Sequence, residues 1–123
     1  RDVAFLQYTS GSTGQPKGVI VPHSALRAQI LSFFHPFGLE LTSDSVMISW
    51  LPHFHDMGLI GCFLAPLCVG ASGHYFSPLT FIKKPLTIVE ISSQVWGTCI
   101  AMPNFGFQYL VNKMFMQKPQ SLT

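Results

Sequence analysis

The chain has 123 residues, a formal net charge of +2 and only 10% charged residues, against about 25% in typical soluble domains. Its few Lys and Arg residues are scattered and form no basic stripe, so the charge pattern does not imply nucleic-acid binding. Because so apolar a chain of this size lacks polar covering, and because it starts at Arg1 without a methionine, we expect residues 1–123 to be one piece of a larger core.

Two features bear on the cellular compartment. No residue from Met57 to Ile82 is Asp, Glu, Lys or Arg, but glycines and prolines interrupt this stretch. Its unbroken apolar part is well short of the ~20 residues that span a membrane, so we expect no transmembrane segment. Cys62, Cys68 and Cys99 are odd in number and form no C-x-x-C pair, which favours free thiols in a reducing, cytoplasmic compartment.

Apolar periodicity and turn residues predict nine elements. In chain order we expect a strand at Val3–Tyr8, a strand at Gly18–Val21, a helix from Pro22–Ser24 through Leu31, a strand at Val46–Leu51, a helix at Met57–Val69, a strand at His74–Phe76, a helix at Thr80–Val95, a strand at Thr98–Met102 and a helix at Asn104–Met116. Ser24 is expected to cap its helix, and Pro85 to lie in the first turns of a later one. Alternating strands and helices predict an α/β fold with a mainly parallel sheet and flanking helices.

The first candidate site is the loop at 8–18, which reads Y-T-S-G-S-T-G-Q-P-K-G. Its glycines can adopt positive φ and turn backbone N–H groups toward a ligand, while the hydroxyls and one amine add further donors. This pattern favours a polyphosphate cradle formed by Thr9, Ser10, Gly11, Ser12, Thr13, Gly14 and Lys17. An ordinary solvent loop joining two strands is the alternative. The spacing matches neither the Walker loop nor the dinucleotide-binding glycine motif.

The second candidate site follows the strand at 46–51, where ligands of open α/β sheets bind. Three interpretations compete. His53, His55 and Asp56 could hold a metal as in a zinc hydrolase, although no further cluster supplies the remaining ligands. Asp56 could cap the next helix, with one histidine held by hydrogen bonds in a structural role. Alternatively an imidazole could face a ligand, with Gly58 and Gly61 leaving a groove for an extended apolar chain.

The two motifs together resemble one family. Y-T-S-G-S-T-G-x-P-K-G is similar to the phosphate loop of adenylate-forming (AMP-binding) enzymes, and W-L-P-x-x-H-D-M-G-L-I-G resembles the segment that follows it in fatty acyl-AMP ligases. Ser77-Pro78 with Phe81, the lysines before Pro85, and Pro103-Asn104-Phe105 extend the resemblance. The sequence departs from the family pattern at Gln108, where an acidic residue is common, and at Thr87-Ile88, where Trp-Leu is common.

The resemblance implies that residues 1–123 belong to the N-terminal AMP-binding domain of a fatty acyl-AMP ligase or long-chain acyl-CoA synthetase, without its C-terminal domain. Such an enzyme uses ATP to convert a fatty acid to acyl-adenylate and releases pyrophosphate. By resemblance, the loop at 8–18 holds the β- and γ-phosphates and His55 lies beside the reacting carboxylate and α-phosphate. Within the acyl and adenylate segment at 50–61, Met57, Gly58 and Gly61 line the acyl tunnel.

The same resemblance sets expectations for cofactors and partners. The residue that holds Mg²⁺ would lie beyond Thr123, so no metal ligand is expected within these residues. The acceptor of the acyl group would be CoA or an acyl carrier protein. We expect the isolated chain to be inactive. The alternative is a non-catalytic acyl- or nucleotide-binding module descended from this family.

Overall fold

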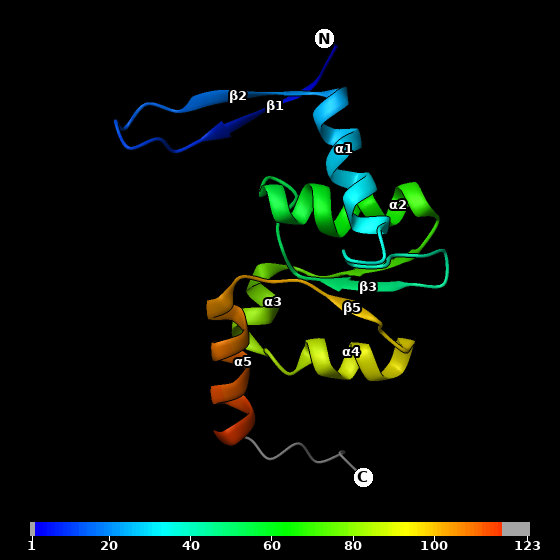
Figure 1. Ribbon diagram of the computed structural model, residues 1–123. Coiled ribbons are helices and arrows are strands. Elements are labelled where there is room, and N and C mark those ends of the chain that lie inside the picture. The colour runs from blue at the N-terminus through cyan, green and yellow to red at the C-terminus, as the bar shows by residue number, and fades with distance from the viewer. Residues whose placement is uncertain (1, 117–123) are drawn as a thin grey trace.

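The structure is a computed structural model that describes residues 2–116 (Figure 1). Its elements, in chain order, are β1 (Val3–Thr9), β2 (Lys17–Pro22), α1 (His23–Phe34), β3 (Val46–Ser49), the π-helix η1 (Met57–Leu64), α2 (Ala65–Val69), β4 (Ser72–Tyr75), α3 (Pro78–Lys83), α4 (Thr87–Val95), β5 (Cys99–Ile100) and α5 (Asn104–Met116). Among residues 2–116, no helix combines the length and apolar character needed to cross a bilayer.

A parallel sheet with the strand order β4-β3-β5 lies at the centre. The chain steps from β3 to β4 in one direction and from β4 past β3 to β5 in the other, and right-handed crossovers therefore place the two sets of helices on opposite faces. Figure 1 shows this arrangement, with α1, η1 and α2 on one side of the sheet and α4 on the other. The expected α/β fold with a parallel sheet is confirmed.

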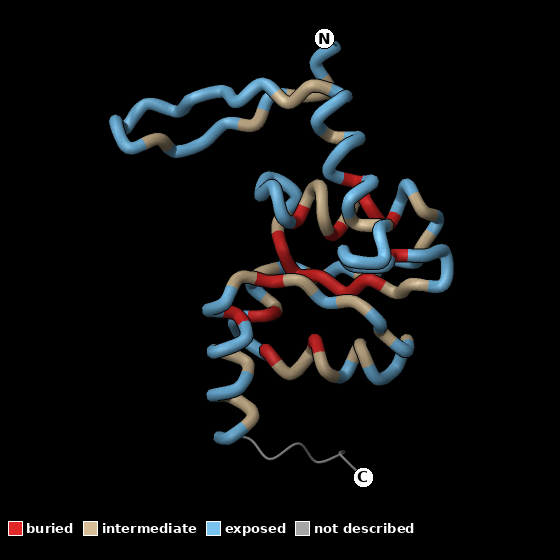
Figure 2. The backbone as a smooth tube through the Cα atoms, viewed as in Figure 1, coloured by how far each residue is buried: buried red, intermediate tan, exposed pale blue. Residues whose placement is uncertain are grey.

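The core is organised around β3, which both helical layers cover. Met47 and Ile48 have no exposed surface and Ser49 has almost none, and Figure 2 shows the buried residues running along this strand. Just after β3, the indole of Trp50 stacks on the ring of Phe81 with 4.3 Å between ring centroids. The near-continuous apolar run in the sequence therefore predicted a strand buried on both faces correctly.

The first two strands form a separate antiparallel hairpin. Thr9 pairs with Lys17 at the end of the ladder, and the loop joins the strands there. In Figure 1 the hairpin extends away from the central sheet, and in Figure 2 most of it is exposed. Its exposed large apolar side chains are Val3, Leu6, Tyr8, Val19 and Ile20.

The predicted Ser24 cap is wrong. Pro22 is the residue before α1, with extended backbone and no side-chain capping bond, and the helix begins two residues earlier than a Ser24 cap would require. The backbone N–H of His23 donates to the carbonyl oxygen of Asp2 at 2.9 Å instead. This bond ties the start of α1 to the start of β1, so a tertiary contact takes the place of the local cap.

The single helix predicted at Thr80–Val95 is also wrong, because the structure has α3 and α4 with a break between them. Lys84 has φ −137° and ψ 74°, as expected for a residue whose helical conformation is blocked by the ring of the proline that follows. Pro85 is buried at this break. The side chain of Ser77 caps α3 by accepting from the N–H of Thr80 at 3.1 Å.

Two glycines of η1 provide a matched stability test. A Cβ at Gly58 would clash with the carbonyl oxygen of Pro52, whereas a Cβ at Gly61 would meet nothing within 4 Å. We expect Gly58→Ala to lower the free energy of unfolding by about 1–3 kcal/mol, because backbone must move. Gly61→Ala should leave it unchanged or raise it by up to about 1 kcal/mol. Urea unfolding measures both, and equal midpoints would contradict the packing described for Gly58.

Candidate functional site

The loop between β1 and β2 has the backbone geometry that a glycine-rich cradle requires. Gly11 and Gly14 have φ of 56° and 77°, in the region that favours glycine. A Cβ at Gly11 would lie 2.8 Å from the carbonyl oxygen of Gln15, so the loop folds closely on itself there. A Cβ at Gly18 on β2 would lie 3.3 Å from the ring of Tyr8, its partner on β1.

The donors of this loop have no protein partners among the described residues. The hydroxyls of Thr9, Ser10, Ser12 and Thr13 make no hydrogen bond to another described group, and Lys17 makes no ion pair with one. All five residues are exposed. The loop therefore presents one amine and several neutral donors to the solvent, as a site for an anionic ligand would.

The histidine loop, which we define as residues 51–56, joins β3 to η1. The N–H of Met57 donates to Asp56 Oδ1 at 2.7 Å and to His55 Nδ1 at 3.2 Å. Asp56 thus caps the helix, as one of the sequence-based interpretations expected. Nδ1 of His55 also lies 3.2 Å from Asp56 Oδ1, so this nitrogen is occupied within its own segment and Nε2 is the ring nitrogen left for a ligand. The side chain is 48% exposed, so a ligand can reach the ring.

The hairpin and the histidine loop are in contact. Nε2 of Gln7 donates to the carbonyl oxygen of Phe54 at 3.3 Å, across 47 positions of sequence. The structure therefore connects the strand that enters the glycine-rich loop with the residue before His55. Figure 1 shows that the loop itself lies at the far end of the hairpin.

The three residues expected to line an acyl tunnel have different surroundings at the start of η1. Gly58 is buried and lies against the backbone of Pro52. It therefore allows η1 to pack closely on the segment that follows β3. Gly61 leaves open space on its side of the helix, and Met57 is exposed. Only Met57 and Gly61 therefore offer surface that an apolar ligand could contact directly.

A cavity of about 360 Å³ opens at the carboxyl ends of β3 and β4. The connections after these neighbouring strands go to opposite faces, which creates the crevice where ligands of such sheets bind. Its lining residues are Leu51, Pro52, His53, Tyr75, Phe76, Ser77 and Pro78. The sequence analysis missed Tyr75 as a cavity residue, although its place at the end of a strand parallel to 46–51 could have indicated it.

The metal interpretation finds no support in the described residues. The imidazole of His53 packs against the rings of Phe63 and Tyr75, with centroids 4.8 and 5.7 Å away, while His55 interacts with Met57 and Asp56. Within residues 2–116, no three His, Cys, Asp or Glu side chains form a group that could hold a metal ion. The two histidines thus contact different residues and do not form a common site.

Burial affects the acidity of three groups behind the site. Desolvation raises the pKa of the Cys62 thiol, which a hydrogen bond with Ser49 partly offsets. Desolvation also raises the pKa of Cys99 and of the Tyr75 phenol. The Tyr75 hydroxyl donates to the carbonyl oxygen of Cys62 at 2.7 Å, so the protonated phenol is the form that connects β4 to η1.

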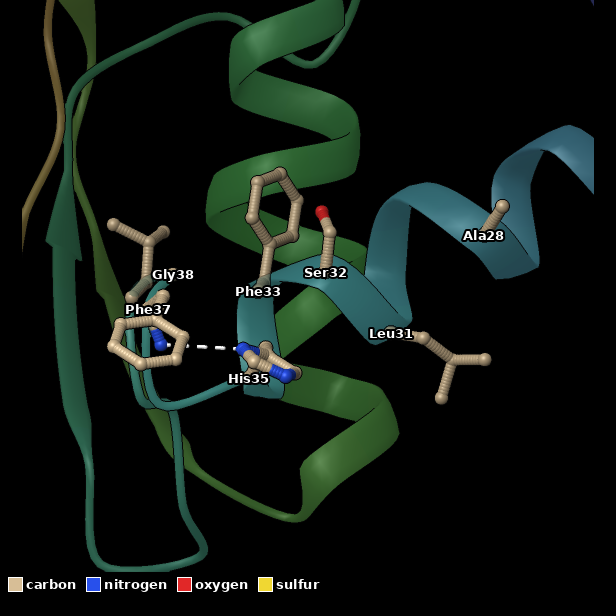
Figure 3. Close-up of a pocket in the computed structure, with 8 residues that line it drawn as sticks. Ala28, Leu31, Ser32, Phe33, His35, Phe37 and Gly38 are labelled. Carbon is tan, nitrogen blue, oxygen red and sulfur yellow. Dashed lines mark hydrogen bonds between the residues drawn. The ribbon is translucent and has the colours of Figure 1, made fainter.

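Two further cavities are lined by none of the predicted site residues. One of about 800 Å³ lies at the end of α1, where Figure 3 shows the rings of His35 and Phe37 facing each other and the Phe37 N–H donating to His35 Nδ1 at 3.3 Å. The other, of about 630 Å³, lies between Trp50, α3 and α5. Gln108, where the family pattern has an acidic residue, borders this second cavity and donates to Asn112 at 3.1 Å.

Comparison with protein families and curated proteins gives one result. Residues 1–122 match the family model of the AMP-binding enzymes. The chain is 41% identical over 110 residues to a medium-chain-fatty-acid–[acyl-carrier-protein] ligase of Teredinibacter turnerae, covering 86% of the chain and 16% of that protein. It is 40% identical over 113 residues to a long-chain-fatty-acid–AMP ligase of Mycobacterium marinum, covering 89% of the chain and 19% of that protein. The chain thus spans less than a fifth of these relatives.

Solved structures that are similar to this chain also include ligands that are adenylates. A fatty acyl-adenylate ligase from L. pneumophila, in complex with acyl adenylate and pyrophosphate, superposes with a TM-score of 0.83 at 40% identity, over 90% of this chain and 19% of that one. The McyG structure complexed with phenylalanyl-adenylate has a TM-score of 0.84 at 25% identity, over 93% of this chain and 17% of that one.

The burial of the thiols predicts a clear order of chemical labelling. Cys68 is exposed and Cys62 is buried. Because buried thiols react slowly, iodoacetamide should modify Cys68 at least about tenfold faster than Cys62. Because the folded pKa of Cys62 is raised, its labelling should stay slow as the pH rises from about 7 to 9. Peptide mass spectrometry gives the rates, and urea-unfolded protein is the control. Equal rates in the folded protein would contradict the burial of η1.

Proposed function

The chain belongs to the AMP-binding enzyme family, and on that premise we propose that it forms part of the N-terminal domain of a longer ligase that activates a fatty acid as its acyl-adenylate. The observation that carries this proposal is the loop at 8–18, with its free donors and positive-φ glycines. The similarity to a ligase that binds acyl adenylate and pyrophosphate supports the choice of ligand.

The proposed reaction joins a fatty carboxylate to the α-phosphorus of ATP. A carboxylate oxygen forms the new O–P bond while the bond from the α-phosphorus to the bridging oxygen of the β-phosphate breaks, and its electron pair leaves with pyrophosphate. A fatty acid is already ionised near neutral pH, so no general base is required. Donors positioned at the departing oxygens lower the barrier most. The hydroxyls and N–H groups at 9–14 and the amine of Lys17 fit this task.

His55 is proposed to orient the reacting groups. Its Nδ1 is occupied by Met57 and Asp56, which leaves Nε2, and we propose that Nε2–H donates to the carboxylate or to an α-phosphate oxygen. The open space beside Gly61 and the exposed side chain of Met57 are proposed to shelter the acyl chain, at about 0.8 kcal/mol per buried CH₂. Gly58 would contribute by keeping the helix close to the strand end.

Cofactor, acceptor and compartment are proposals as well. Within residues 2–116, no three His, Cys, Asp or Glu side chains group together, and by resemblance to the family we propose that the acidic residue that would hold Mg²⁺ lies beyond Thr123. CoA or an acyl carrier protein is the proposed acceptor, in line with the acyl-carrier-protein ligase among the relatives. Three free thiols suit a reducing compartment such as the cytoplasm. A non-catalytic binding module is less favoured, since the relatives at 40–41% identity are named as ligases.

Replacement of Lys17 tests the proposed phosphate role. In the longer ligase, Lys17→Ala should lower kcat/KM in fatty-acid-dependent ATP–pyrophosphate exchange by about 10²–10³-fold, as loss of one preorganised donor does. Lys113→Ala is the control, because that amine lies over the ring of Tyr109 on α5, and it should leave exchange unchanged. The 123-residue chain alone should show no exchange. Unchanged activity of Lys17→Ala would remove the phosphate role from this loop.

Enlarging Gly61 tests the proposed acyl position. A side chain at Gly61 meets open space, so Gly61→Leu should fold but fill the volume proposed for the substrate. We expect KM to rise for long-chain acids and to stay near the wild-type value for short ones, since each excluded CH₂ costs about 0.8 kcal/mol. A series of acids of increasing length in the exchange assay measures this. An equal change for every length would place the chain elsewhere.

A further inference from the structure

We propose that Gln7 is a positioning residue that holds the histidine loop against the hairpin, so that His55 reaches the ligand bound by the loop at 8–18. This inference rests on the proposed function and assigns a role to a residue outside the motifs that carry phosphate or acyl binding. Gln7 would touch neither substrate, and it would act through the backbone of Phe54.

The geometry of β1 directs Gln7 toward the histidine loop. Successive side chains of a strand point to opposite faces, so Gln7 lies on the same face as Thr9, which enters the glycine-rich loop. Its Nε2 reaches the carbonyl oxygen of Phe54 at 3.3 Å. Among residues 2–116, this is the one side-chain hydrogen bond that joins the hairpin to any residue beyond α1.

The acceptor of this bond belongs to the peptide unit that carries the N–H of His55. A peptide unit is planar, so a hydrogen bond that fixes the Phe54 carbonyl also fixes the direction of the His55 N–H. That N–H donates to the Pro52 carbonyl oxygen at 3.1 Å. Two hydrogen bonds therefore hold the peptide between Phe54 and His55. The hairpin binds its carbonyl oxygen, and the histidine loop itself binds its N–H.

The other contacts of the histidine loop do not fix its distance from the hairpin. The imidazole of His55 interacts with Met57 and Asp56, which belong to its own segment. The ring of Phe54 is 85% exposed, so it does not anchor the loop by packing. Besides the packing of α1 on η1, the Gln7 bond is the direct link between the phosphate donors' hairpin and the histidine loop, and the relative placement of these groups is what transition-state geometry requires.

The chemistry at this position requires a donor. The amide of Gln7 can donate to a carbonyl, whereas a glutamate of the same shape offers only acceptors when ionised. Gln7→Glu and Gln7→Met both remove the bond while keeping the length of the side chain. Gln94→Met is the matched control, because Gln94 is exposed on α4 and makes no hydrogen bond with another described residue.

The experiment is a double-mutant cycle in the full-length ligase, measured by fatty-acid-dependent ATP–pyrophosphate exchange. Gln7→Met and Gln7→Glu should each lower kcat about 10–100-fold, the effect of a small misplacement of a reacting group. KM for ATP should stay within about threefold, because binding contacts remain. In the His55→Ala background, Gln7→Met should cause no further loss, since residues that act as a unit are non-additive.

Each other outcome overturns the inference. Losses that multiply in the double variant, or a Gln7 effect confined to KM for ATP, would mean that Gln7 does not act through His55. A Gln7→Met loss no larger than that of Gln94→Met would have the same meaning. If the wild-type ligase shows no fatty-acid-dependent exchange, the proposed function fails as well, so the two failures are distinguishable.

Discussion

Burial of β3 on both faces is the constraint on which the rest of the structure depends. Met47 and Ile48 are completely enclosed, and the strand bonds to β4 on one side and to β5 on the other. Side chains along a strand that is covered on both faces cannot reach a ligand. Polar side chains that contact a ligand therefore come after the end of the strand. The histidine loop begins directly there, after Trp50 is stacked in place by Phe81.

The two candidate elements differ in how firmly they are held. The histidine loop is attached to the core at both ends, by β3 and by the Asp56-capped η1. The glycine-rich loop lies at the end of an exposed ribbon whose two strands pair with no other strand within the described residues. The Gln7 bond is where these two kinds of element meet.

The sequence predicted what depends on local pattern. The predicted start of the helix at Asn104 agrees with α5, since Pro103 marks it, and the chain is helical through Met116, the last described residue. β3 was recognisable from a short apolar run between Asp44 and Pro52. The glycine-rich loop was recognisable as a motif because its residues are consecutive. Glycine geometry at 11 and 14 then followed from residue type.

The remaining features depend on contacts between distant residues. Whether Pro85 would continue a helix or break it depended on the backbone of Lys84. The strand expected at Thr98–Met102 is only Cys99–Ile100, because β5 has a single neighbouring strand to define its length. No pattern in the sequence pairs Gln7 with Phe54 or His53 with Tyr75, since each pair is far apart in the chain.

The hairpin has one more property that matters for handling the protein. A two-stranded ribbon is marginal in water, and both outer edges of this one are unpaired within the described residues while Leu6 and Ile20 face outward. Open edges with apolar side chains recruit strands from other chains. Unless further strands of the same polypeptide cover these edges, copies of the chain should join edge to edge and precipitate, so boundaries for recombinant expression are best chosen to include whatever pairs with β1 and β2.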